Sequence, residues 1–271
     1  MLDNILSVLI FIYRQKRIPN IFSPKSLTEK ILKIKLSRNS KTSNLRKIIS
    51  DRLGVRDYLK MKSQESILID LLWKGSELEI ETWLLLPQKF VIKATHGSKM
   101  VRIVDKNIDS FEEINSLSKG WLDIDYYKKG REWVYKDTER LLIIEKFIEF
   151  SGDVPPDYKF FCMNGVVSFV QVDLDRFNGH SRSIYDKNFK LLDVAYQFSK
   201  GYEIDKPVLF NNAKVIAEKL SEDFDFIRVD LYILDDQIYF GELTNFPGNC
   251  LESFTPHSFD IQMGSKLKLE L

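Results

Sequence analysis

Apolar and polar residues follow two different periods along the chain. Between residues 26 and 61, apolar residues recur mainly every three or four positions, which predicts helices separated by a polar loop at 37–43. Ser26 and Glu29 have the spacing of a capping box, so a helix is predicted to begin there. The charged residues of the second helical stretch are interpreted as solvent-exposed: Arg46, Lys47, Asp51, Arg52, Arg56 and Asp57.

In the second two thirds of the chain, short apolar runs typical of strands alternate with helical segments. Runs at 158–163 and 166–172 flank Asn164-Gly165, a strong hairpin signal, and runs at 228–234 and 238–243 flank a polar turn. Hairpins imply antiparallel pairing. The chain contains no G-x-G-x-x-G and no G-x-x-x-x-G-K-[ST] motif. We therefore predict an α+β fold rather than a doubly wound parallel sheet.

Composition excludes several classes of protein. The 271 residues are 44% hydrophobic, which is enough for a large core. The formal net charge is +1, so no overall field draws the protein to nucleic acid, and we expect no nucleic-acid partner. Cys162 and Cys250 stand in apolar surroundings and are predicted to be buried free thiols. The chain has three histidines and no C-x-x-C pair, so it offers few ligands for a zinc site.

The N-terminal segment needs a separate interpretation. Residues 5–13 are apolar except for Ser7, and three basic residues follow within positions 14–17. The stretch is far shorter than the ~20 residues that span a bilayer, and it lacks the pattern of a signal peptide. We interpret it as a first helix buried against the body of a cytoplasmic protein. The alternative is a peripheral contact of residues 1–17 with the inner face of a membrane.

Two carboxylates in the last predicted hairpin form a candidate metal site. Asp230 lies on the first strand and Glu242 on the second, and a tight hairpin can set them side by side. Neighbouring buried carboxylates repel unless a cation or proton lies between them, and Mg²⁺ prefers such oxygen ligands. Arg228 points the same way as Asp230, because the two are two residues apart on a strand. On periodicity alone, a surface hairpin with ordinary ion pairs is an equal alternative.

Lys93 is a candidate anion-binding residue. It interrupts the apolar strand run 90–94, and burying a lysine is costly without an anionic partner. The polar loop that follows contains one glycine, and its backbone N–H groups can suit phosphate. This loop contributes four candidate residues: His96, Gly97, Ser98 and Lys99. For His96, a merely structural role is an equal alternative.

The C-terminal hairpin resembles the C-terminal signature of the ATP-grasp superfamily. Three segments carry the resemblance: Arg228-Val229-Asp230, Phe240-Gly241-Glu242-Leu243-Thr244 and Pro247-Gly248. The resemblance implies that Asp230 and Glu242 bind Mg²⁺ bridging the phosphates of ATP, and that Arg228 steadies an acyl-phosphate step. The third metal ligand of the superfamily is an asparagine. Here Thr244 occupies that position and Asn245 follows it, so both are candidates.

Two further segments resemble parts of an ATP-grasp nucleotide site. The run Glu145-Lys146-Phe147-Ile148 resembles the hinge strand that meets adenine, which implies ATP contacts by these four residues. Lys159 matches a basic residue that reaches the phosphates from a neighbouring strand, which implies a catalytic role beside Arg228. Lys93 and the loop 96–99 precede them in the order that such a nucleotide site requires.

Over nearly its whole length, the chain resembles the TupA-like ATP-grasp family of polysaccharide biosynthesis. Six segments carry this resemblance: 23–30, 55–58, 90–98, 131–135, 157–165 and 228–244. It implies an ATP-grasp fold in which two α+β lobes clasp ATP. We expect a helical substrate-side region at 1–88, a lobe with the phosphate lid at 89–144, and a lobe with the adenine hinge and metal carboxylates at 145–271. Lys99 departs from the family, which usually has glycine after Ser98.

The resemblance also implies a function. Members of the family are associated with joining amino acids to uronic-acid carboxylates of surface glycans such as capsule. We therefore expect a ligase that uses ATP and Mg²⁺ to form an amide through an acyl phosphate. Its expected partners are a carboxylate-bearing sugar or glycan and an amino acid or amine.

Three alternatives stay open. A sugar kinase could use the same ATP-grasp body. A glycosyltransferase could hold a metal and a nucleotide sugar with a D-x-D motif. Two segments have this pattern: Asp123-Ile124-Asp125 and Asp173-Leu174-Asp175. The pattern is common by chance in a chain with 39 acidic residues. A non-catalytic glycan-assembly partner, anchored by residues 1–17, is the third alternative.

Overall fold

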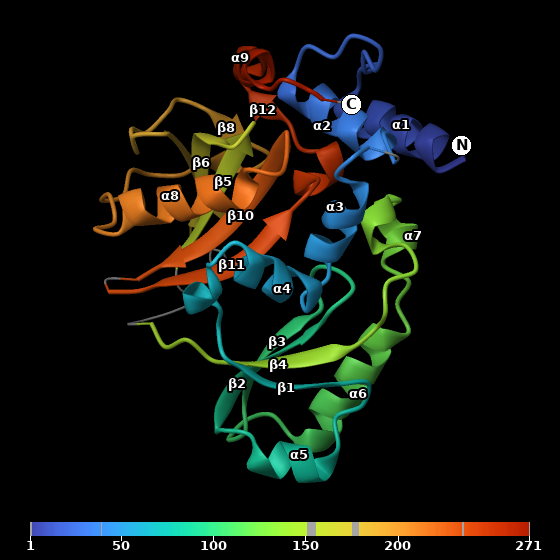
Figure 1. Ribbon diagram of the computed structural model, residues 1–271, viewed down its shortest axis with the longest axis vertical. Helices are drawn as coiled ribbons and strands as arrows, with labels where there is room; N and C mark the ends of the chain where they lie inside the picture. The colour runs from blue at the N-terminus through green and yellow to red at the C-terminus, as the bar shows by residue number, and fades with distance from the viewer. Residues whose placement is uncertain (1, 39, 151–155, 175–178, 235, 271) are drawn as a thin grey trace.

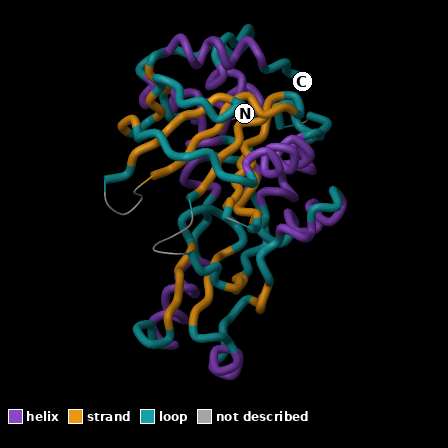
Figure 2. Tube along the Cα trace, turned by 90° about the vertical axis from the view of Figure 1, so that its left-hand side faces the viewer, coloured by secondary structure: helices purple, strands orange, loops and turns teal. Residues whose placement is uncertain are grey.

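Two separate sheets organise the chain into a larger and a smaller lobe. The computed structural model describes residues 2–38, 40–150, 156–174, 179–234 and 236–270. A six-stranded sheet forms the larger lobe, in the upper half of Figure 1, and a four-stranded sheet forms the smaller lobe below it. The same division is visible after a quarter turn (Figure 2). The predicted α+β class is confirmed.

The six-stranded sheet has the order β11-β10-β5-β6-β7-β9, and its neighbours are antiparallel except for β7 and β9. Its strands are β5 Asp157–Met163, β6 Val166–Leu174, β7 Ser181–Asp186, β9 Ser199–Lys200, β10 Phe226–Ile233 and β11 Ile238–Thr244. The predicted hairpin at Asn164-Gly165 joins β5 to β6, and both turn residues have positive φ, 50° and 78°. Asparagine and glycine tolerate this conformation better than other residues, which explains the turn.

The four-stranded sheet has the order β1-β4-β2-β3 and is antiparallel throughout. Its strands are β1 Leu71–Gly75, β2 Lys89–Ala94, β3 Val101–Asp105 and β4 Leu142–Lys146. Helices α5 (Ile80–Leu85) and α6 (Phe111–Leu122) lie against it and close a separate core around Phe90, Ile92 and Ile144. The smaller lobe therefore has its own hydrophobic core.

Helices cover both faces of the six-stranded sheet. The helices outside the smaller lobe are α1 Leu2–Gln15, α2 Leu27–Leu36, α3 Ser43–Ser50, α4 Gly54–Met61, α7 Tyr127–Gly130, α8 Phe210–Ser221 and α9 His257–Lys266. Helix α8 packs on β5, β6 and β10, while α2 packs on α9 over the opposite face. The capping box predicted at Ser26 and Glu29 is present at the start of α2. The short β12 (Phe254–Thr255) pairs with β8 (Ala195–Tyr196), and 3₁₀ turns lie at Glu65–Ile67, Trp133–Tyr135 and Pro247–Cys250.

The strand grouping divides the chain differently from the predicted regions. Strand β1 and helix α5 belong to the smaller lobe although they fall within the expected helical region 1–88. Glu145 and Lys146 also belong to it, because β4 pairs with β1 and β2. The reason is long-range pairing: the partner strands lie about 70 residues apart in sequence, as Leu71 opposite Glu145 shows.

Arg46 corrects the interpretation of the helix charges as solvent-exposed. It lies on α3 with 0% of its surface exposed. Its guanidinium donates to the backbone oxygen of Phe226 at 3.0 Å and to Oδ1 of Asp225 at 2.6 Å. The burial is compensated by these bonds, so Arg46 fastens α3 to the six-stranded sheet.

Helix α1 is less buried than predicted. Only Ser7 and Phe11 of this helix are buried, and Phe11 enters the core beneath α2. Within the described residues, no helix has the length and apolar character needed to cross a membrane. Cys162 and Cys250 are buried free thiols, as predicted.

Candidate active site

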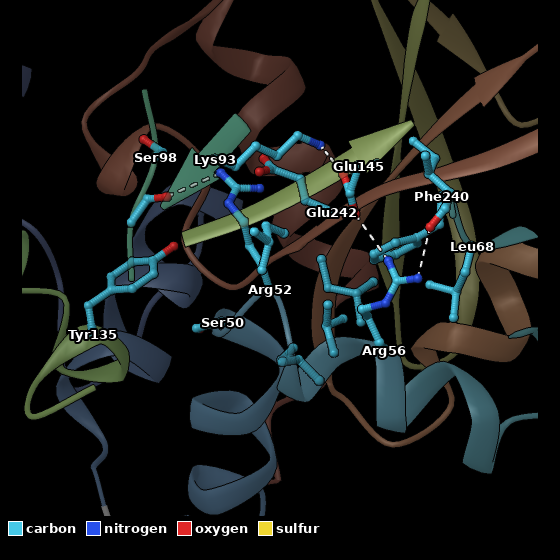
Figure 3. Close-up of a pocket in the computed structure, with 17 residues that line it drawn as sticks. Ser50, Arg52, Arg56, Leu68, Lys93, Ser98, Tyr135, Glu145, Phe240 and Glu242 are labelled. Carbon is cyan, nitrogen blue, oxygen red and sulfur yellow. Dashed lines mark hydrogen bonds and ion pairs between the residues drawn. The ribbon is translucent and has the colours of Figure 1, made fainter. Parts of the chain in front are cut away.

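A cleft opens between the two lobes. It consists of two adjoining hollows of about 40 Å³ and about 210 Å³. Both hollows are lined by the same five residues: Arg52, Lys93, Ser98, Gly241 and Glu242. Lys93 comes from the smaller lobe and Glu242 from the larger one, and Figure 3 shows them facing the same space beside Arg52. The cleft is therefore built by both sheets.

The predicted pairing of the two hairpin carboxylates is confirmed. Asp230 of β10 lies directly opposite Glu242 of β11, and Arg228 lies opposite Thr244. The ladder is irregular beside Asp230, where a Cβ on Gly241 would lie only 3.0 Å from the Asp230 carbonyl oxygen. Asp230 is 2% exposed, whereas the Glu242 side chain is 41% exposed. One carboxylate is thus buried and the other is open to the cleft.

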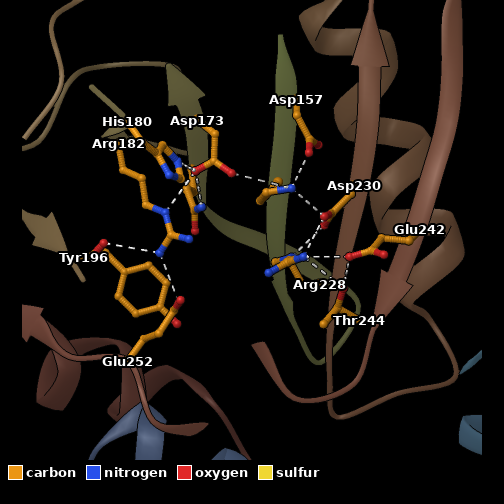
Figure 4. Close-up of polar contacts among 12 residues, drawn as sticks. Asp157, Asp173, His180, Arg182, Tyr196, Arg228, Asp230, Glu242, Thr244 and Glu252 are labelled. Carbon is orange, nitrogen blue, oxygen red and sulfur yellow. Dashed lines mark hydrogen bonds and ion pairs between the residues drawn. The ribbon is translucent and has the colours of Figure 1, made fainter. Parts of the chain in front are cut away.

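A guanidinium nitrogen lies where the candidate metal ligands converge (Figure 4). Nη2 of Arg228 lies 2.6 Å from Oδ2 of Asp230, 3.0 Å from Oε1 of Glu242 and 3.0 Å from Oγ1 of Thr244. Two carboxylates and a hydroxyl thus surround one cationic atom, and Mg²⁺ takes oxygen ligands of this kind. The described residues contain no cluster of three or more Asp, Glu, His or Cys suited to a metal. A metal here would need further ligands such as phosphate or water.

Lys159 of β5 is a second buried cation in this region. Its ammonium contacts Asp157 and lies 2.8 Å from Oδ2 of Asp230 and 3.9 Å from Oδ2 of Asp173. Burial alone would lower the pKa of Lys159, but the carboxylates of Asp157 and Asp230 more than offset burial and raise it. Burial also raises the pKa of Asp230, although Arg228 and Lys159 oppose this. Lys159 therefore stays charged inside the protein.

Lys93 has the anionic partner that its burial requires. Its Nζ donates to Oε2 of Glu145 at 2.6 Å, and Oε1 of Glu145 accepts from Nη1 of Arg56 at 3.0 Å. The three residues line the smaller hollow (Figure 3). The residues expected at phosphate and at adenine therefore lie side by side on β2 and β4.

The other predicted hinge residues lie outside the two hollows. Lys146 ends β4 with its side chain 62% exposed, and Phe147 and Ile148 follow it half-buried. None of the three lines either hollow. Contacts of all four residues with adenine stay a prediction, and of the four only Glu145 lines the cleft.

The predicted phosphate loop borders the cleft. Gly97 and Ser98 line the smaller hollow and Lys99 the larger one. The hydroxyls of Ser98 and Tyr126 lie 2.7 Å apart. A Cβ on Gly97 would lie 2.5 Å from the Tyr126 ring, so only glycine fits this close approach. Tyr126 therefore holds the loop near the cleft.

Two candidate residues point elsewhere. Nε2 of His96 lies 3.2 Å from the backbone oxygen of Ile124, and burial lowers the pKa of His96, which favours its neutral form. The Asn245 amide donates to the Arg46 backbone oxygen and to Oγ of Ser50, at 3.0 Å and 2.9 Å. Both side chains have structural contacts of their own. The geometry thus favours Thr244, beside Glu242, as the third metal-ligand candidate.

Sequence reasoning missed three residues of this region. Arg52 and Arg56 were interpreted as solvent-exposed, yet both line the cleft, and Nε of Arg52 donates to the Ala94 backbone oxygen at 2.9 Å. Burial raises the pKa of the third, Glu132, to about 7, although Lys35 opposes this. The resemblance at 55–58 and 131–135 was the available signal for Arg56 and Glu132.

Arg52 also affects the open carboxylate of the hairpin. Burial alone would raise the pKa of Glu242, but Arg228, Lys159 and Arg52 together lower it to about 2. Glu242 is therefore ionised at neutral pH. An anionic, partly exposed oxygen ligand thus faces the cleft.

The polar face of the larger sheet continues beyond Lys159. Nε of Arg182 donates to Oδ1 of Asp173 at 2.9 Å, and its Nη1 donates to Oε2 of Glu252 at 3.0 Å (Figure 4). Asp173 was a candidate for a D-x-D metal motif with Asp175, which lies outside the described residues. Asp173 instead belongs to this ion-pair network.

Comparison with known proteins identifies the class to which this fold and site belong. The family model of the TupA-like ATP-grasp proteins matches residues 25–268. No curated protein sequence matches the chain. The chain belongs to the TupA-like ATP-grasp family, as its sequence motifs predicted.

Solved structures with detectable similarity include three ligases. A D-alanine–D-alanine ligase from Bacillus anthracis complexed with ATP is 16% identical, with 73% of this chain and 55% of that chain covered and a TM-score of 0.44. The Helicobacter pylori enzyme is 17% identical, with coverages of 83% and 60% and a TM-score of 0.45. The ATP-grasp ligase PsnB, complexed with precursor, Mg and ADP, is 10% identical, with coverages of 89% and 67% and a TM-score of 0.46. The chain spans less than two thirds of either D-alanine–D-alanine ligase.

Substitutions at Thr244 and Asn245 separate a ligand from a structural residue. Asn245→Ala is expected to lower the free energy of unfolding by about 1–3 kcal/mol, because it removes an acceptor from buried Arg46. Thr244→Val is expected to leave stability within about 1 kcal/mol but to weaken magnesium-dependent nucleotide binding. Urea denaturation and calorimetric titration measure the two effects. Full stability with lost binding in Asn245→Ala would reverse the assignment.

Glu132 gives a pH-dependent stability prediction. Its pKa of about 7 lies above the ordinary value of 4.5, so between these values the folded state holds a proton that the unfolded state has lost. Stability therefore falls as pH rises through this window. Glu132→Gln removes this effect, so its stability relative to the parent should be greater at pH about 8 than at pH about 5. Urea denaturation at both pH values tests this, with exposed Glu139→Gln as control. An equal difference at both pH values would contradict it.

Proposed function

We propose that this protein is an ATP- and Mg²⁺-dependent ligase that joins a carboxylate to an amine through an acyl phosphate. One observation carries the proposal: oxygens of Asp230, Glu242 and Thr244 converge on a single cationic atom at the cleft. Lys93 reaches the same cleft from the opposite lobe. Paired carboxylates facing basic residues suit a magnesium–polyphosphate complex. Membership of the ATP-grasp family supports the choice of nucleotide.

Each residue then has a defined task. Asp230, Glu242 and Thr244 would hold Mg²⁺, which supplies charge neutralisation to the phosphates when bound. Lys93 and Lys159 stabilise negative charge on the transferred phosphoryl group. Arg228 and a bound metal would compete for the same oxygens. A guanidinium released from them is available to the oxyanion that forms when the amine attacks the acyl carbon.

The substrates are proposed at the level of chemical class. The carboxylate belongs to a uronic-acid unit and the amine to an amino acid, in the assembly of a surface polysaccharide such as capsule. This choice follows from the association of TupA-like proteins with such glycans, which the sequence resemblance implies. Arg52 and Arg56 add basic groups that suit a carboxylate substrate at the cleft. The need for ATP places the reaction in the cytoplasm.

The products distinguish this activity from its alternatives. A ligase releases ADP and phosphate only when both a uronic acid and an amine are present, and it forms an amide detectable by mass spectrometry. ADP together with a phosphorylated sugar would indicate a kinase, and UDP release from a nucleotide sugar would indicate a glycosyltransferase. Either of these results would overturn the proposal.

Removing either hairpin carboxylate should abolish most of the activity. Asp230→Asn and Glu242→Gln are each expected to lower ATP turnover by at least about 100-fold, because each neutralises a ligand that the magnesium needs. Asp236→Asn is the matched control, since Asp236 is an exposed acid in the turn of the same hairpin. Turnover is measured as ADP release at saturating Mg²⁺, with the uronic acid and amine that support turnover by the parent. Parent-like turnover in both variants would disprove the metal assignment.

A further inference from the structure

The outer face of α1 is apolar and exposed. Leu2, Ile5, Leu9 and Tyr13 have exposed fractions of 70%, 49%, 56% and 71%. At 100° per residue they fall within an arc of about 80°, so they form one stripe along the helix. Phe11, in contrast, is fully buried beneath the helix. The helix is therefore fixed to the protein by one edge and presents a row of large apolar side chains outward.

Two further exposed apolar residues follow α1 in the sequence. Ile18 is 82% exposed and Phe22 is 96% exposed. Phe22 has the largest exposed fraction of the large apolar residues in the described part of the chain. Scattered exposed apolar residues are normal, but six within 21 positions of one terminal segment form a patch. We define the α1 surface as these six residues: Leu2, Ile5, Leu9, Tyr13, Ile18 and Phe22. Figure 1 shows α1 at the margin of the larger lobe, far from α5.

The exposed and unpaired charges of the segment that carries the α1 surface are positive. Arg14, Lys16 and Lys25 are exposed, and none of them forms an ion pair with a residue that the structure describes. The ammonium of Lys16 lies 4.5 Å from the Tyr13 ring, at the edge of the apolar stripe. Three unpaired cations thus lie in the terminal segment that carries the patch, and Lys16 borders the apolar stripe, although the whole chain carries a net charge of only +1.

The acidic residues near this surface are already neutralised. Asp3 pairs with Arg38 at 3.0 Å and lies 3.6 Å from Arg131. Glu29 pairs with Arg17 at 2.5 Å. These pairs leave Arg14, Lys16 and Lys25 to determine the local potential. The Asp3 pairs also tie α1 to the segments after α2 and α7, so the surface is held in place on the folded protein.

We propose that the α1 surface docks on an anionic phospholipid bilayer. Large apolar side chains bordered by lysine and arginine are the features of helices that lie in the bilayer interface. The helix has 14 residues, about 21 Å in length, so it can lie on the membrane but not cross it. A second copy of the chain is a poorer occupant, because a two-fold interface would enclose two sets of the same unpaired cations without adding an anionic partner. Anionic lipid headgroups instead match their charge.

Vesicle co-sedimentation tests this proposal. The full chain is expected to bind vesicles of phosphatidylcholine with about a third phosphatidylglycerol, and to bind pure phosphatidylcholine vesicles much more weakly. Leu9→Ser combined with Phe22→Ser is expected to lower the partition coefficient at least about tenfold, because both side chains enter the interface. Leu85→Ser combined with Val208→Ser is the matched control, since these apolar residues are 89% and 86% exposed elsewhere on the molecule. The control should bind like the parent.

Three results would overturn the proposal. The first is no binding of the parent to the anionic vesicles, and the second is parent-like binding of the Leu9/Phe22 variant. The third is a parent dimer in vesicle-free buffer that the same variant converts to monomer, which would make the surface an interface between copies. Urea denaturation verifies that the variant is folded. ATP turnover measured without vesicles tests the nucleotide site independently of membrane binding. Failure of the proposed function is therefore distinguishable from failure of membrane docking.

Discussion

The candidate site depends on one electrostatic constraint: the hairpin register sets two carboxylates side by side, and this requires a cation between them. In the structure, Nη2 of Arg228 meets this requirement, and the ammonium of Lys159 supports the buried member, Asp230. Arg228 therefore occupies the position that we propose for a metal ion.

The apolar cores and ion pairs of the larger lobe offset the cost of burying these charges. One face of the sheet is apolar, with Phe160, Val229 and Leu231 packed under α8 and α4. The other face is divided: Phe161 and Phe226 enter a second core, while the polar network occupies the remainder. Burying the charges is compensated within the network by opposite charges on adjacent strands. The apolar cores thus fix the strand register that brings the charges together.

Local features were predictable from the sequence, and long-range ones were not. The capping box at Ser26, the Asn164-Gly165 turn and the alignment of Asp230 with Glu242 each depend on residues close in sequence. The cost of burying a lone lysine in an apolar strand also pointed to Lys93, whose side chain lines the cleft from the smaller lobe. Sequence patterns identify residue types but not the contacts that these residues make. The ion pair of Lys93 with Glu145 was therefore not predicted.

The wrong predictions of solvent exposure for Arg46 and Arg52 have a common physical origin. Arg46 and Arg52 look like surface charges within an amphipathic helix, because nothing nearby in sequence reveals their partners. Arg46 bonds to Asp225, about 180 residues away, and Arg52 bonds to the Ala94 backbone in the other lobe. The exposed face of α1 reflects the same difficulty. A row of apolar residues predicts burial, but only the packing of the whole chain shows which side is covered.

The most direct test of the central claim is a crystal structure with ADP and Mn²⁺, in which anomalous scattering locates the metal. The account predicts metal bonded to carboxylate oxygens of Asp230 and Glu242, nucleotide between the two sheets near Lys93, and Arg228 released from Glu242. Nucleotide bound elsewhere, or nucleotide in the cleft with Arg228 still bridging both carboxylates and no metal between them, would contradict it.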